Sequence, residues 1–157
     1  MISITLPNHL ACLHDALLLV DTAPVECDGH TLMVSVALTK ARIRHERIVG
    51  SVIGKDSKFS LAPHFWINID GYLLDYRLRM WVSAFNGPEM AQCAPHGIFP
   101  ENSDTHCYKY MISDTRPVAD MSSATLNFMT DGFAGKLAIP TQTIAYYNDE
   151  HNMTLSH

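Results

Sequence analysis

The sequence predicts an α+β domain in which N-terminal helices pack on an antiparallel sheet. Helical apolar patterns come first, at residues 8–20 and 27–41, and a β-rich segment follows at 47–53. An Asp-Gly step at residues 70–71 then joins two apolar runs, which is a strong hairpin signal. Helices followed by a run of strands are typical of the α+β class.

The two predicted helices have consistent end signals. Asn8 is a suitable cap for the first helix. Pro24 disfavours helical conformation at the residue before it, so the first helix should end before residue 24. The second helix has acidic residues at its start, Glu26 and Asp28, and basic residues after Thr39, which is the arrangement that the helix macrodipole prefers. This places Cys27 in the first turn of the second helix.

The hairpin places a histidine and an aspartate together. A two-residue turn at Asp70-Gly71 pairs Ile69 with Tyr72 and Ile67 with Leu74, and brings Trp66 opposite Asp75. Because side chains alternate between the faces of a sheet, His64 shares its face with Asp75, diagonally across the two strands. This geometry suits a carboxylate that holds an imidazole ring.

Residues after Trp81 give a weaker pattern. Frequent Pro and Gly residues predict a long irregular section, followed by a strand at 108–112, a short helix at 122–131 and an interrupted segment at 137–147. We interpret residues 1–157 as one domain with an irregular C-terminal extension from about residue 82.

Composition excludes several classes of protein. The 157 residues are 47% hydrophobic and 17% charged, as expected for a globular chain, and a net charge of -5 argues against a nucleic-acid partner. The sequence has no apolar run of about 18 residues and no secretory signal pattern at its start. We therefore expect a cytoplasmic protein without a membrane partner, whose four cysteines are reduced.

Cys27 is the candidate nucleophile. Free backbone N–H groups at a helix start favour the thiolate, which is the reactive form of cysteine, and a nearby imidazole adds to this effect. Together with His64 and Asp75, Cys27 completes a Cys-His-Asp set of the kind used by papain-like thiol enzymes.

These residues resemble a known family. The Cys27 helix start, the strand reaching Gly50 and the segment His64-Phe-Trp-Ile-Asn-Ile-Asp-Gly-Tyr-Leu-Leu-Asp75 are similar to the transglutaminase-like core of the papain-like cysteine enzymes. The likeness covers residues 25–81 and is closest to the short bacterial type that includes lasso-peptide leader peptidases. It implies a papain-like fold, with Cys27 as nucleophile, His64 as general base and acid, and Asp75 orienting His64.

Other residues are candidates for contact with a peptide or protein substrate. Trp66 would shield the site, Arg77 and Arg79 continue the site face and suit an acidic group or a C-terminal carboxylate, and His96 is a candidate lining residue. We expect no cofactor and no metal. The sequence leaves the oligomeric state open.

Alternative interpretations remain for each of these features. Cys27 also fits a buried small hydrophobe, His64 a strand histidine bonded to a carbonyl, and Asp75 a surface ion-pair partner. Four further residues carry atoms that zinc can bind: Cys93, His96, His106 and Cys107. The side chains of adjacent residues such as the last two usually point in different directions.

At the level of function, the sequence favours a thiol hydrolase that acts on an amide or acyl bond. An acyl or amine transferase, a non-catalytic binding or inhibitor protein on the same fold, and a zinc-stabilised structural protein are the alternatives.

Overall fold

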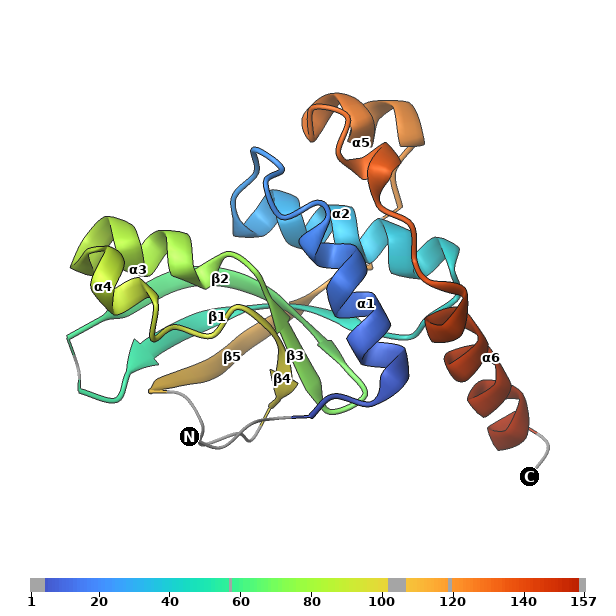
Figure 1. Cartoon of the computed structure of the whole chain (residues 1–157), viewed down its shortest axis with the longest axis horizontal. Helices are drawn as coiled ribbons and strands as arrows, with labels where there is room; N and C mark the ends of the chain where they lie inside the picture. Colours follow the sequence, from blue (N-terminus) through green and yellow to red (C-terminus); the bar gives the residue numbers. More distant parts are fainter. Residues whose placement is uncertain (1–4, 57, 102–106, 119, 156–157) are drawn as a thin grey trace.

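The structure, a computed structural model, describes residues 5–56, 58–101, 107–118 and 120–155. These residues form six α-helices and one five-stranded antiparallel sheet, which confirms the predicted α+β class (Figure 1). The helices are α1 (Asn8–Leu18), α2 (Cys27–Lys40), α3 (Leu78–Asn86), α4 (Pro88–Ala91), α5 (Ser123–Met129) and α6 (Thr141–Leu155). The strands are β1 (Glu46–Gly54), β2 (Ser60–Ile69), β3 (Tyr72–Asp75), β4 (Gly97–Pro100) and β5 (Tyr108–Arg116), and a short 3₁₀ helix covers Ala134–Lys136.

The predicted hairpin register is confirmed. Ile69 pairs with Tyr72 and Ile67 with Leu74, across a turn in which Asp70 has φ 52° and Gly71 has φ 78°. Both turn residues thus have the positive φ angles that the tight turn requires. The register places His64 and Asp75 on the same face of the sheet, as the alternation of side chains predicts.

The second hairpin strand, β3, ends at Asp75, and a helix follows it. The sequence interpretation had Arg77 and Arg79 continue the face of this strand, but α3 begins at Leu78, so neither residue belongs to the sheet. The Asp75 carboxylate accepts hydrogen bonds from the backbone N–H groups of Arg77 and Leu78, so it satisfies donors that a new helix leaves free. Asp75 therefore ends the strand as well as facing His64.

The chain after residue 82 is also more regular than expected. Following α3 and α4, β4 pairs with β3, and β5 pairs with β1, giving the sheet order β4-β3-β2-β1-β5. β4 is only a short segment between Gly97 and Pro100, so its sequence shows no alternating pattern, and pairing with the edge of β3 gives it strand geometry. The C-terminal half thus supplies both edge strands.

Two apolar clusters lie on opposite faces of the sheet. One joins α1 and α2 to Ile67, Ile69 and Leu74, and the other joins α3 to Ile48, Trp66 and Leu73. Because neighbouring residues of β2 and β3 belong to different clusters, both faces of the hairpin are buried. None of the described helices combines the length and apolarity that a membrane crossing requires.

Gly50 allows the sheet to pack closely beside His64. Gly50 pairs with His64 on β2, and the register between β1 and β5 shifts at Gly50. A Cβ atom at residue 50 would overlap the Met111 backbone oxygen and would lie 2.7 Å from a ring carbon of Trp66. Glycine is therefore required here by the close approach of β5 and Trp66.

We expect Gly50→Ala to lower the free energy of unfolding by about 3 kcal/mol, because a backbone oxygen cannot move away as a flexible side chain can. Urea denaturation measures this change, with Ser51→Ala on the same strand as the control. Equal stability of the two variants would contradict the close approach at Gly50.

Candidate active site

Cys27 is the first residue of α2, as predicted. The residue is 6% exposed, and Glu26 before it has an extended backbone. The N–H groups of this first helical turn have no partners within the helix and favour a negative charge on a neighbouring group. The location therefore suits a thiolate.

His64 lies on β2 and is fully buried. Its Nε2 atom is 2.7 Å from Asp75 Oδ2, so the histidine and the aspartate meet across the hairpin as the register predicts. Nδ1 is buried and makes no regular hydrogen bond to any residue that the structure describes. The Cys27 side chain is nevertheless close enough to His64 to raise its pKa. Nδ1 is the nitrogen that remains for the thiol.

The Asp75 carboxylate is fully satisfied by protein groups. Oδ1 accepts from the backbone N–H groups of Arg77, at 2.9 Å, and Leu78, at 3.1 Å. Oδ2 accepts from His64 Nε2 and from the hydroxyl of Tyr110, each at 2.7 Å. A buried carboxylate with this many donors is held in its charged form.

Charge at the pair follows from these contacts. Burial opposes the charged form of both groups, but Asp75 and its hydrogen bond, together with Cys27, raise the pKa of His64 from 6.5 to about 10. Burial likewise opposes ionisation of Asp75, but His64, the Arg77 backbone N–H and Tyr110 lower its pKa below 3.8. At neutral pH the site therefore contains an imidazolium beside a carboxylate.

The sequence interpretation missed Tyr110. This residue lies on β5, far along the chain from the hairpin, and only the pairing of β5 with β1 brings its hydroxyl to Asp75. Burial and the Asp75 charge raise the pKa of Tyr110 well above 10, so the phenol stays protonated and donates. The predicted strand at 108–112 was a signal for β5, but no local pattern marks residue 110 as a partner of Asp75.

Trp66 packs against the pair. Its ring centroid lies 6.1 Å from that of His64 and 5.0 Å from that of Tyr110, the latter edge-on. Trp66 is fully buried, so it excludes water from the His64 side of the site and strengthens the electrostatic interactions there.

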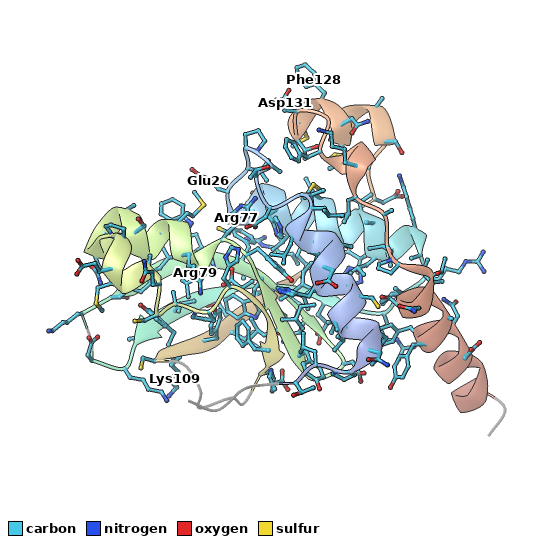
Figure 2. All side chains as sticks on the ribbon, in the orientation of Figure 1. Glu26, Arg77, Arg79, Lys109, Phe128 and Asp131 are labelled. Carbon is cyan, nitrogen blue, oxygen red and sulfur yellow. The ribbon has the colours of Figure 1, made fainter. Side chains whose placement is uncertain are left out.

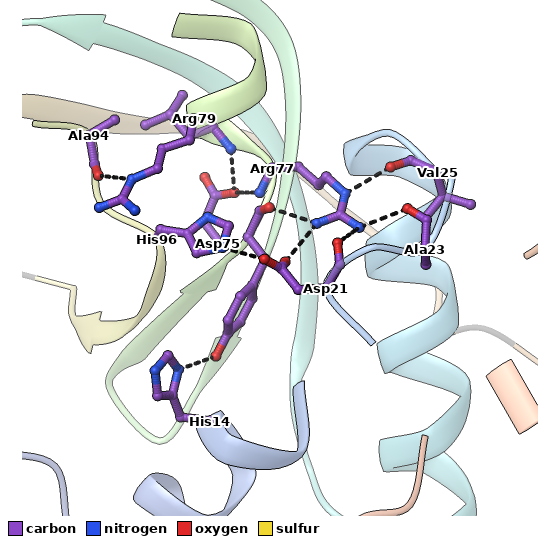
Figure 3. Close-up of polar contacts among 11 residues, drawn as sticks. His14, Asp21, Ala23, Val25, Asp75, Arg77, Arg79, Ala94 and His96 are labelled. Atoms are coloured by element: carbon purple, nitrogen blue, oxygen red, sulfur yellow. Dashed lines mark hydrogen bonds and ion pairs between the residues drawn. The ribbon is translucent and has the colours of Figure 1, made fainter. Parts of the chain in front are cut away.

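Arg77 has a different place from the one expected for a substrate-binding residue. Its guanidinium is buried and donates to the backbone oxygens of Asp21, Ala23 and Val25 and to the Asp21 carboxylate (Figure 3). A further bond goes to its own neighbour, the Tyr76 carbonyl. These bonds use the guanidinium N–H groups, so no pair of them remains to bind a substrate carboxylate. Arg77 instead joins the loop before Cys27 to the end of β3, which brings the helix start to the His64–Asp75 pair.

Arg79 and His96 lie beside the hydrogen bonds that join Arg77 to the loop before Cys27 (Figure 3). Arg79 Nε donates to the Ala94 carbonyl at 2.9 Å, and His96 Nε2 is 2.8 Å from Asp21 Oδ2. His96 therefore touches the same aspartate as Arg77. It lines a hollow beside the loop that precedes Cys27.

The residues that the structure describes contain no group of three or more His, Cys, Asp or Glu side chains arranged to hold a metal ion. Of the residues considered for zinc, His106 lies outside the described residues, while Cys93 and Cys107 are free and exposed.

Comparisons with protein-family models, with curated proteins and with solved structures found no match to this chain.

The contacts of His64 predict its titration. We expect the His64 ring to titrate near pH 10, and Asp75→Asn to lower this pKa, because the largest opposition to the burial of the charged ring is then removed. NMR of the ring C–H groups measures both values. His64 stabilises the fold fully below pH 6.5, and this contribution is lost as pH rises through about 10. A His64 midpoint near 6.5 in the unmodified protein would contradict the pair.

The Tyr110 hydroxyl predicts a pH-dependent loss of stability. Tyr110→Phe should lower the free energy of unfolding at pH 7 by about 1.5–3 kcal/mol, the usual value of a hydrogen bond to a charged group. The pKa of Asp75 is lowered in the folded protein. The difference in stability between wild type and Tyr110→Phe should therefore be at its full value above pH 3.8 and become smaller as the pH falls further. Urea denaturation of both proteins, repeated at about five pH values between pH 2 and pH 7, measures this difference in the free energy of unfolding. Tyr108→Phe on the same strand is the control, and an equal loss in both variants would exclude a specific role for the Asp75 bond.

Proposed function

We propose that this protein is a thiol-dependent hydrolase that acts on an amide or acyl bond through Cys27, His64 and Asp75. The carrying observation is the arrangement of His64: Nε2 is bonded to a buried carboxylate, and unpartnered Nδ1 remains for a cysteine at a helix start. This order of nucleophile, base and orienting acid is the general requirement for nucleophilic catalysis.

The chemistry follows the charges of the site. The Cys27 sulfur, with its proton on His64, attacks the carbonyl carbon, and the negative oxygen is stabilised by the Cys27 backbone N–H. Collapse of this intermediate breaks the bond to the leaving group, which takes the proton from His64. Water then loses a proton to His64, attacks the acyl-cysteine and releases the acid and the thiol. Asp75 keeps the ring oriented throughout.

The fold supports the same proposal at a coarser level. A helix begins at the cysteine, and antiparallel strands bearing the histidine and the aspartate follow, in the order of the transglutaminase-like core. We propose that the domain is papain-like on this basis.

A cytoplasmic setting suits the chemistry because a thiol nucleophile must remain reduced. The four cysteines are all free: Cys12, Cys27, Cys93 and Cys107.

One observation favours a second candidate. Cys27 is 6% exposed as a whole residue, so a substrate has little access to it. A non-catalytic binding protein on the same fold would retain the buried pair without needing access to the thiol. Reactivity of Cys27 therefore separates the two functions.

We expect iodoacetamide to alkylate Cys27 near neutral pH faster than Cys93 or Cys107, even though those two side chains are exposed. Mass spectrometry of peptides from the folded protein measures each rate. His64→Gln should slow the reaction at Cys27 by about tenfold or more and leave the exposed thiols unchanged. If Cys27 reacts only after unfolding, the hydrolase proposal fails and the binding protein is favoured.

A further inference from the structure

A hollow lies beside the loop that precedes the candidate nucleophile. Its volume is about 420 Å³, and its walls include Pro24, Val25 and Glu26 of the loop, Arg77 and Met80 at the start of α3, and His96. Glu26 is the residue before Cys27, and Arg77 follows Asp75 by two residues. The hollow therefore lies between the segments that hold two of the three proposed catalytic residues.

Most charges at this hollow are already compensated inside the protein. Arg77 is bound by backbone oxygens and by Asp21, and Asp21 is bound by both Arg77 and His96. On the other side of Cys27, Asp28 forms an ion pair with Arg47. None of these groups is free to pair with a charged ligand.

Glu26 is the exception. It occupies the N-cap position of α2, but its side chain makes no capping hydrogen bond, and no residue in the described ranges pairs with its carboxylate. Figure 2 shows Glu26 on the outer side of the loop, above Arg77. The hollow thus has one uncompensated negative charge next to an aliphatic wall made of Pro24, Val25 and Met80.

We propose that this hollow is a substrate subsite for a positively charged aliphatic side chain of the lysine or arginine type. The methylene groups of the side chain would contact Pro24, Val25 and Met80, and its charged end would pair with Glu26. The proposal rests on the proposed hydrolase and names its substrate class. It replaces the expectation that Arg77 receives an acidic group, because the guanidinium bonds are used within the protein.

Charged thiol reagents test the subsite without a known substrate. The Cys27 thiolate attacks the sulfenyl sulfur of a methanethiosulfonate, a disulfide forms, and methanesulfinate leaves with the electron pair of the broken S–S bond. The probes are the cationic 2-aminoethyl, the anionic 2-sulfonatoethyl and the neutral methyl reagents. The measurement is the cationic-to-anionic rate ratio at Cys27, followed by mass spectrometry in a Cys93→Ser, Cys107→Ser background.

Glu26→Gln should lower this ratio by about 25-fold, because one charge about 4 Å away in water changes each rate about fivefold, in opposite directions for the two reagents. Glu26→Lys should lower the ratio further. The matched control is Glu89→Gln on α4, which makes the same change in net charge but does not line the hollow. Added salt should reduce the wild-type preference for the cationic reagent.

An unchanged ratio in Glu26→Gln, or an equal change in Glu89→Gln, overturns the subsite while the hydrolase proposal stands. A Cys27 that does not react with the neutral reagent in the folded protein overturns both proposals. Because Glu26 is exposed and makes no side-chain hydrogen bond to a described residue, its variants should fold as the parent does, and circular dichroism checks this.

Discussion

The buried Asp75 carboxylate is the group on which the arrangement of this protein depends. It accepts from His64 on β2, from Tyr110 on β5 and from the two N–H groups that open α3. A charge removed from water in this way is tolerated only when it is fully hydrogen-bonded, since losing one partner of a buried charge pair costs about 3–5 kcal/mol. The carboxylate thus joins three elements of the sheet and one helix at a single point.

The same carboxylate links stability to the proposed chemistry. Asp75 raises the pKa of His64, so the ring is charged at neutral pH and can hold a proton taken from a thiol. Arg77, which lies in the short link between β3 and α3, binds the loop before Cys27 and brings the start of α2 to the ring. The groups that end β3 therefore also bring together the sulfur and the imidazole from separate parts of the chain.

Sequence reasoning succeeded where the governing interactions are local. The Asp70-Gly71 turn determines the hairpin register, and the alternation of β-strand side chains then places His64 near Asp75. It failed where a strand forms only by pairing with a distant neighbour. β4 has little pattern of its own. The start of α3 depends on backbone N–H groups that donate to Asp75, which the sequence pattern after residue 75 does not indicate.

By itself, the sequence determined the α+β class, the helix that starts at Cys27 and the His64–Asp75 pair, because periodicity, capping and turn chemistry act over a few residues. Only the tertiary structure decided that Tyr110 is the second donor to Asp75 Oδ2, that Arg77 serves the loop, and that Glu26 keeps an uncompensated charge. Each of these depends on which distant groups satisfy a buried or exposed charge, and that is settled by packing across the whole domain.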